Sequence, residues 1–228
     1  MTDWNEARCA EINASLEDST AEEIAAWAVA EFGESLAVAA SMQDTILPHL
    51  FGSQLEGVDV LFLETGYHFP ETLATRDEAA RTLPITVVNV TPKKTVAEQD
   101  AEFGKDLFST DPNTCCFLRK VDPLARALEG YSAWVTGTRR VDAPTRANTP
   151  VVTWDDKHAL VKINPLALWS DEDVENYQVK HALPRNPLVA AGYPSIGCAP
   201  CTRKVAPGED PRAGRWSGTD KVECGIHE

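Results

Sequence analysis

The chain has 228 residues, of which 43% are hydrophobic and 25% charged, with a formal net charge of −14. These ordinary globular proportions exclude a disordered chain, a collagen and a minimal disulfide scaffold, and the length suits one domain with a small appendage. Acidic residues dominate residues 1–111, which argues against nucleic-acid binding, whereas an excess of Arg and Lys in residues 112–150 can form a pocket for a small anion.

Strands and helices are expected to alternate along the chain. Five strands are predicted from short apolar runs: residues 35–40, 58–63, 85–90, 133–136 and 160–163. Four helices are predicted from amphipathic or capped segments: residues 20–32, 44–51, 69–83 and 170–181. This alternation predicts a single-domain α/β fold, with a parallel sheet covered by helices on both faces.

Three segments are expected: an N-terminal helical segment (1–34), an α/β nucleotide-binding domain (35–183) and a C-terminal segment (184–228). The last is rich in Gly, Pro and Arg, so we expect an irregular, mobile tail that carries chemistry. The N-terminus lacks the apolar stretch of a secretory signal, and no apolar run approaches the ~18 residues of a membrane span. A cytoplasmic protein without a membrane partner is therefore expected.

Loops that follow strands are candidate sites, because ligands in parallel α/β folds bind beyond the carboxyl ends of the strands. Ser41 to Asp44 could hold a phosphate at a helix N-terminus, although a Ser there is also an ordinary helix cap. Thr65 and Gly66 follow the second strand, where turn chemistry alone explains the glycine. The glycine-rich loops of P-loop NTPases and dinucleotide dehydrogenases are missing from the sequence, which argues against both classes.

Arginines gather in the loop after the fourth predicted strand. Arg139, Arg140 and Arg146 lie there, and Arg212 and Arg215 repeat the pattern in the C-terminal segment. Arginine suits bidentate recognition of phosphate or sulfate. The alternative is a solvated basic loop.

Six cysteines are present, and in a reducing cytoplasm they favour metal binding or redox chemistry over structural disulfides. Cys115 and Cys116 are adjacent and can converge on one centre only from a helix or turn. Cys198 and Cys201 form a C-x-x-C pair that can reach one metal or cluster. The spacing alone leaves open an iron–sulfur cluster, a four-cysteine zinc site or a reactive dithiol.

A family resemblance emerges from the motifs taken together. They are Cys115-Cys116-x-x-Arg119-Lys120, Gly137-Thr138-Arg139-Arg140 with Ala143-Pro144-Thr145-Arg146, Gly197-Cys198-Ala199-Pro200-Cys201, Arg212-Ala213-Gly214-Arg215-Trp216 and Glu223-Cys224-Gly225-Ile226-His227. From about residue 35 to the end, the sequence resembles the assimilatory adenylyl-sulfate reductases of the APS/PAPS reductase family. The resemblance implies an adenine nucleotide alpha hydrolase-like fold.

The resemblance also implies a thioredoxin-dependent reduction of adenosine 5′-phosphosulfate (APS) to sulfite and AMP. Cys224 would be the nucleophile that forms an S-sulfocysteine, which reduced thioredoxin or a similar dithiol resolves. Four cysteines would ligate one [4Fe–4S] cluster of structural and electrostatic role: Cys115, Cys116, Cys198 and Cys201. Lys120 would be a cation between this cluster and the substrate.

The implied substrate-binding residues surround the expected nucleotide. They are Ser41, Asp44, Thr65, Gly66, Lys120, Arg139, Arg140, Arg146, Arg212, Arg215 and His227. The sequence departs from the family pattern at Glu64, where Asp is usual, and at Met42-Gln43, where the commoner form is Gly-Ala-Glu. A homo-oligomer is compatible with the sequence, which does not set the oligomeric state.

Three alternatives stay open. A PAPS reductase would use the same chemistry, but such enzymes generally lack the two cysteine pairs. An ATP pyrophosphatase expects an S-G-G-x-D-S loop, which this sequence does not contain. A zinc-binding module with four cysteine ligands and no enzymatic activity would be colourless, whereas the cluster predicts a brown protein.

Overall fold

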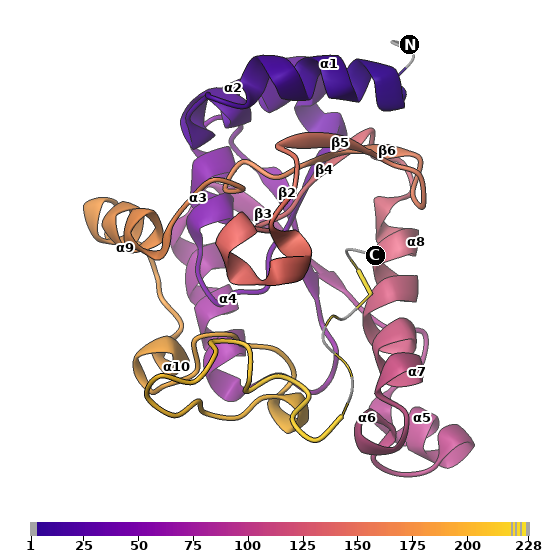
Figure 1. The fold of residues 1–228 in the computed structure, drawn as a ribbon. Helices are drawn as coiled ribbons and strands as arrows, with labels where there is room; N and C mark the ends of the chain where they lie inside the picture. The colour runs from indigo at the N-terminus through magenta and orange to yellow at the C-terminus, as the bar shows by residue number, and fades with distance from the viewer. Residues whose placement is uncertain (1–3, 220, 222, 224, 227–228) are drawn as a thin grey trace.

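The structure is a computed structural model that describes residues 4–219, 221, 223 and 225–226 (Figure 1). Its centre is a six-stranded sheet in the order β3-β2-β1-β4-β6-β5. The strands are β1 (Leu36–Ala39), β2 (Val58–Leu63), β3 (Ile85–Val90), β4 (Ala133–Val135), β5 (Val152–Asp155) and β6 (Leu160–Ile163).

All five predicted strands are confirmed, but the sheet is not wholly parallel. Val38 of β1 lies between Val60 of β2 and Val135 of β4 in parallel register, and β4 pairs parallel with β6. β5, which the sequence did not reveal, pairs antiparallel with β6 at the sheet edge. The prediction of a purely parallel sheet is therefore wrong at this edge, because a hairpin adds a strand that no crossover helix precedes.

Ten α-helices are found among the described residues, and several of them cover the sheet. They are α1 (Glu6–Leu16), α2 (Ala21–Phe32), α3 (Ile46–Gly52), α4 (Pro70–Thr82), α5 (Val96–Phe103), α6 (Leu107–Thr110), α7 (Pro112–Cys116), α8 (Asp122–Leu128), α9 (Asp171–Lys180) and α10 (Pro187–Ala190). The four predicted helices are confirmed to within two residues at each end as α2, α3, α4 and α9. Capping boxes at Thr20 and Ser170 explain why α2 and α9 were readable from the sequence.

The two faces of the sheet bury different sets of residues. Leu36 and Val38 of β1 join the larger core with residues of α2, α3 and α4. Ala37, on the other face of β1, packs in a second cluster with Leu124 of α8 and Trp134 of β4. Helices thus lie on both faces, as predicted.

The terminal segments pack against this domain. Cys9 of α1 is buried in the larger core, and burial raises the pKa of its thiol. The C-terminal segment is largely irregular, as predicted, and Ile226 packs against the second cluster. The division into three segments stays a prediction. Among the described residues, no helix combines the length and apolar character that crossing a membrane requires.

Candidate active site

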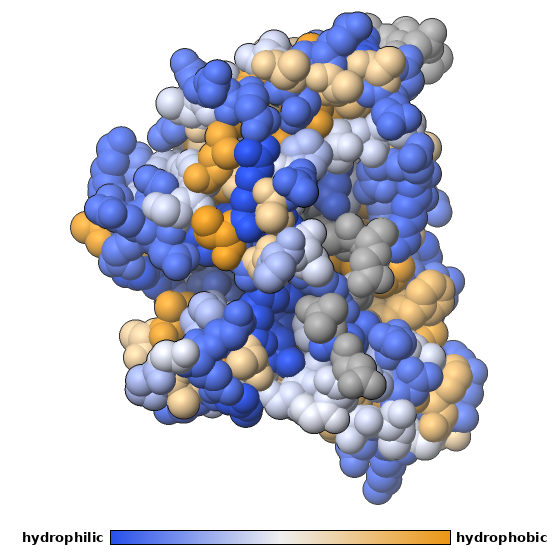
Figure 2. Space-filling model, viewed as in Figure 1, coloured by the Kyte–Doolittle hydropathy of each residue, from blue (hydrophilic) through white to orange (hydrophobic). Residues whose placement is uncertain are grey.

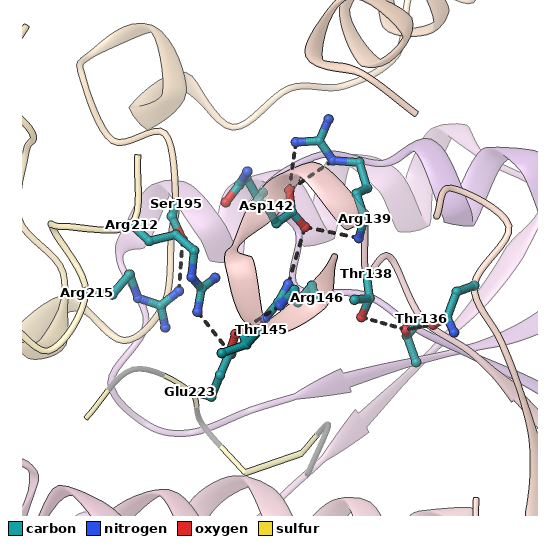
Figure 3. Close-up of polar contacts among 12 residues, drawn as sticks. Thr136, Thr138, Arg139, Asp142, Thr145, Arg146, Ser195, Arg212, Arg215 and Glu223 are labelled. Carbon is teal, nitrogen blue, oxygen red and sulfur yellow. Dashed lines mark hydrogen bonds and ion pairs between the residues drawn. The ribbon is translucent and has the colours of Figure 1, made fainter. Parts of the chain in front are cut away.

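The loop after β4 places two arginines around one carboxylate (Figure 3). Asp142 accepts hydrogen bonds from Arg139 Nε at 3.1 Å and from Arg146 Nη1 at 3.3 Å. Arg139 also donates through Nη2 to Asp171 at 2.8 Å, at the start of α9. Two short 3-10 turns, Arg140–Asp142 and Pro144–Arg146, give the loop this shape.

The C-terminal segment adds a second pair of arginines. Glu223 accepts from Arg146 Nη2 at 2.8 Å and from Arg212 Nη2 at 3.0 Å, so it joins the loop to this segment. Arg215 donates to Ser195 Oγ at 3.2 Å and lies over the Trp216 ring at 4.5 Å. The centre of the face shown in Figure 2, where these loops meet, is hydrophilic.

Arg140 points away from this group. It donates to Glu17 Oε1 at 2.6 Å and to the Thr149 carbonyl at 2.8 Å. The structure therefore brings together Arg139, Arg146 and Arg212, while Arg140 connects the loop to the segment that follows α1.

The predicted phosphate loop is tied to the C-terminal segment. Gln43, which had no predicted role, donates to the Pro194 carbonyl at 3.1 Å and accepts from the Ile196 amide at 2.8 Å. Asp44 accepts a hydrogen bond from the amide of Ile46, the first residue of α3, at 3.1 Å, and burial raises the pKa of its carboxyl. Ser41 is exposed and Met42 is buried with φ +59°. In the sequence, Gln43 is visible only as part of a departure from the family pattern. Its bonds to residues about 150 positions away could not be predicted from the sequence.

The four predicted cluster ligands line a single pocket, together with Tyr67, Phe108, Pro112, Arg119, Lys120 and Trp216. Cys115 and Cys116 end α7, which continues into a π-helical turn over Phe117–Val121. Cys198 directly precedes a 3-10 turn, Ala199–Cys201, and Cys201 is its last residue. Cys115 and Cys116 thus lie on a helix, one of the two conformations that let adjacent cysteines face one centre, and Cys198 and Cys201 lie at a turn.

Electrostatics in this pocket disfavour free thiolates. Burial and the charges of the other three thiols raise the pKa of Cys115 to about 12. Burial and Cys198 raise the pKa of Cys201 to about 11, while Lys120 acts to lower it. Among the residues that the structure describes, no three His, Cys, Asp or Glu side chains are arranged to hold a single metal ion.

The loop after β2 is built against the cysteine helix. Gly66 has φ +75° and donates its amide to Glu64 Oε1 at 2.9 Å, so the longer Glu still closes this turn. Thr65 Oγ1 lies 3.3 Å from Cys198 Sγ. Arg119, which is 4% exposed, donates to the Thr65 carbonyl and to Gln99 Oε1.

Arg119 is thus a supporting residue for which we predicted no role, although it stands in the Cys115-Cys116-x-x-Arg119-Lys120 motif. Its signal in the sequence was its place in that motif. The predicted Cys224 and His227 lie outside the described residues. Their neighbours are anchored, since Lys157 Nζ donates to the Gly225 carbonyl at 3.0 Å and Lys221 Nζ to Asn113 Oδ1 at 2.6 Å.

Comparison of the sequence with known proteins identifies close relatives. The model of the phosphoadenosine phosphosulfate reductase domain matches residues 35–204. An adenosine 5′-phosphosulfate reductase of Mycolicibacterium smegmatis is 58% identical over 214 residues, covering 94% of this chain and 91% of that protein. A protein of the same name from Streptomyces coelicolor is 56% identical over 212 residues, covering 93% and 90%.

Solved structures share the fold. The phosphoadenylyl-sulfate (PAPS) reductase of Candida auris, solved as a phosphate complex, has a TM-score of 0.75 at 26% identity and covers 88% of this chain and 98% of that chain. Candida glabrata FMN adenylyltransferase shares the fold alone, with a TM-score of 0.57 at 13% identity over 86% of this chain and 72% of that chain. These neighbours confirm the adenine nucleotide alpha hydrolase-like fold, and with the sequence matches they show that the chain belongs to the family of APS and PAPS reductases.

Proposed function

We propose that this chain reduces APS to sulfite and AMP in assimilatory sulfate reduction, using a thioredoxin-like dithiol. The observation that carries the proposal is the 58% identity, over 94% of the chain, to a protein named adenosine 5′-phosphosulfate reductase. The arginine group supports it, because APS carries negative charge on both its phosphate and its sulfate. Guanidinium groups bind such oxyanions through paired, charge-assisted hydrogen bonds.

Substrate binding would use side chains from both sides of the site. Arg139 and Arg146 come from the loop after β4, and Arg212 and Arg215 come from the C-terminal segment. Ser41, Asp44, Thr65 and Gly66 lie on the loops after β1 and β2, where nucleotides bind in α/β sheets. His227 is added to the binding set on the family pattern alone. Arg140, which pairs with Glu17, would support the loop and not contact the substrate.

The chemistry would proceed in two displacements. The Cys224 thiolate attacks the sulfur of APS, the bond from sulfur to the bridging oxygen breaks, and AMP leaves with the electron pair. A thiolate of reduced thioredoxin then attacks the Cys224 sulfur of the S-sulfocysteine, and sulfite leaves with the electrons of the S–S bond. The second thioredoxin thiol closes its disulfide and frees Cys224, so the dithiol supplies both electrons.

We propose that Cys115, Cys116, Cys198 and Cys201 hold a [4Fe–4S] cluster. A pocket in which burial and neighbouring thiols raise the pKa of Cys115 and Cys201 fits a cationic centre, because metal coordination deprotonates thiols. A cluster also offers each thiolate its own iron, whereas a single zinc requires all four sulfurs to converge on one ion. When bound, the cluster would supply a structural anchor and a fixed charge beside Lys120, which lines the same pocket.

Cofactor analysis and a sulfite assay test these proposals. Protein purified without oxygen should be brown, contain iron and acid-labile sulfide, and release sulfite from APS with reduced thioredoxin. Colourless protein with one bound zinc and no sulfite release would support the four-cysteine zinc module instead.

The structural similarity to the Candida auris PAPS reductase keeps PAPS as the second candidate substrate. Turnover of APS and PAPS should be compared on the same preparation, and we expect APS to be preferred. Because the reaction needs a free thiolate and a dithiol reductant, we propose a reducing compartment, the cytoplasm.

A further inference from the structure

The carboxylate of Glu223 is the meeting point of two site arginines. It accepts from Arg146 through both oxygens, at 3.0 Å from Nε and 2.8 Å from Nη2, and from Arg212 Nη2 at 3.0 Å. Thr145 Oγ1 adds a longer bond of 3.4 Å. The side chains are well shielded, with 11% of Glu223, 14% of Arg146 and 17% of Arg212 exposed. Glu223 is therefore largely shielded from water and paired with two arginines.

Opposite charges alternate from Asp171 to Arg212, and Figure 3 shows the part of this network from Arg139 to Arg212. Arg139 bridges Asp171 and Asp142, Asp142 contacts Arg146, and Glu223 joins Arg146 to Arg212. Burial alone would raise the pKa of Glu223, but the hydrogen bond and charge of Arg146 and the charge of Arg212 hold that pKa below its usual range. Glu223 is thus an anion at neutral pH, paired with two of the cations expected to bind the substrate.

The contact between Glu223 and Arg146 has the form of an oxyanion complex. A fork of two parallel N–H···O bonds serves a carboxylate, a phosphate or a sulfate equally well. A substrate oxyanion and the Glu223 carboxylate therefore need the same guanidinium donors, and one must leave for the other to bind.

We propose that Glu223 is an internal occupant of the substrate's anion site, which the phosphate or sulfate of the substrate displaces, so that binding releases the segment next to Cys224. This inference rests on the proposed function. Displacement would be local, because contacts on both sides remain: Lys221 is held by Asn113, Gly225 by Lys157, and Ile226 packs in the second cluster. Glu223 would thus be a positioning residue that couples occupancy of the arginines to the freedom of the neighbouring Cys224.

The test measures binding of APS itself. In the full-length protein with its cluster, Cys224→Ser prevents turnover, and calorimetry gives the dissociation constant with and without Glu223→Gln. Removing the competing charge should lower that constant about three- to tenfold, since a larger fraction of the protein is then competent to bind. A residue with a purely structural role would leave the affinity unchanged or weaken it, and either result would overturn the proposal.

Glu209→Gln is the matched control, because Glu209 also pairs with an arginine of this segment, Arg203, which is not in the proposed binding set. It should leave APS affinity unchanged. If the Cys224→Ser protein bound no APS, the proposed function itself would fail, which is a different outcome from binding that Glu223→Gln does not tighten.

A second measurement uses the native nucleophile without nucleotide. Iodoacetamide should alkylate Cys224 faster in Glu223→Gln than in wild type, and at the wild-type rate in Glu209→Gln. Equal rates in all three proteins would contradict release of the segment.

Discussion

At the scale of single residues, the site is a set of arginines whose charges are already balanced. Arg139, Arg146 and Arg212 each face a carboxylate, and all three are largely shielded from water. Charges held in this way are oriented before an anionic ligand arrives, so little rearrangement of the guanidinium groups is needed on binding. Arg146 is central, because it contacts both Asp142 and Glu223.

Arg146→Ala should therefore weaken APS binding strongly. Truncating one partner of a buried, hydrogen-bonded charge pair costs at least about 2 kcal/mol, or roughly a 30-fold rise in the dissociation constant. Arg203→Ala is the control, because Arg203 pairs with Glu209 at an exposed position and exposed pairs contribute little. Titration calorimetry with APS, with Cys224→Ser present in both proteins to prevent reaction, compares the two, and equal affinities would remove Arg146 from the binding site.

The arginine and cysteine sets could be predicted from the sequence because their residue types and spacing carry the chemistry. The partners Glu223, Gln43 and Arg119 could not be assigned, since their roles come from contacts between segments far apart in the chain. The outward position of Arg140 depends likewise on Glu17, which lies 123 residues away.

At the scale of elements, the loop after β2 and the cysteine helix support each other. A Cβ added to Gly66 would lie 2.9 Å from Val96 Cγ2 and 3.1 Å from Arg119 Nη2, and the residue also has φ +75°. Glycine is needed here for two independent reasons, the backbone conformation and the close approach of Arg119.

Gly66→Ala should destabilise the protein by more than the roughly 1 kcal/mol expected for a positive φ alone. Gly130→Ala separates the two causes, because Gly130 has φ +99° and nothing within 4 Å of the added Cβ. Urea unfolding of both variants gives the comparison. Equal losses of unfolding free energy in the two variants would show that the Arg119 and Val96 side chains shift to accommodate the added methyl group without a further cost.

The contact between α3 and α9 predicts an acid-sensitive stability. His49 of α3 lies 2.9 Å from the Tyr177 hydroxyl, and burial, followed by the charge of His181, lowers the pKa of His49 from 6.5. Above pH 6.5 the His49 ring is neutral in both the folded and the unfolded protein, so its contribution to the free energy of unfolding is fully present there. As the pH falls, the unfolded chain takes up the proton first, so this stability is lost through the lowered folded pKa.

Unfolding free energy should therefore decrease between pH 7.5 and pH 5.5, and it should decrease less in His49→Gln. Urea unfolding at the two pH values measures both slopes. Parallel pH dependence in the two proteins would contradict a role for His49.

Element prediction from the sequence succeeded where periodicity or caps were strong and failed where partners decide the structure. β1 and β2 are apolar runs, and α2 and α9 carry capping boxes. β5 contains Asp155 and Thr153 among its four residues and is defined by its pairing with β6. The short helices from α5 to α8 were not predicted, because helices of four to eight residues depend on tertiary contacts more than on propensity.

At the scale of the whole molecule, the C-terminal segment crosses the carboxyl ends of the strands and meets both candidate centres. Arg212 and Glu223 contribute to the arginine group, while Cys198, Cys201 and Trp216 line the cysteine pocket. Figure 1 shows this segment, coloured from orange to yellow, below the loop after β4. The C-terminal segment thus contributes side chains to both the arginine group and the cysteine pocket.

Substitution of the proposed nucleophile and substitution of a proposed cluster ligand should have different effects. Cys224→Ser should abolish sulfite release while leaving the brown colour, iron content and APS binding unchanged, because Cys224 is not one of the proposed cluster ligands. Cys198→Ser, in contrast, should lose colour and iron. Absorbance, iron analysis and a sulfite assay distinguish them, and loss of colour in Cys224→Ser would mean that Cys224 is a ligand.

The most direct test of the central claim is to mix the protein with APS in the absence of any reductant and locate the covalent product by peptide mass spectrometry. The account predicts one added SO3 group on the peptide that contains Cys224, removed by reduced thioredoxin and missing in Cys224→Ser. An SO3 group on another side chain, or no covalent product at all, would contradict it.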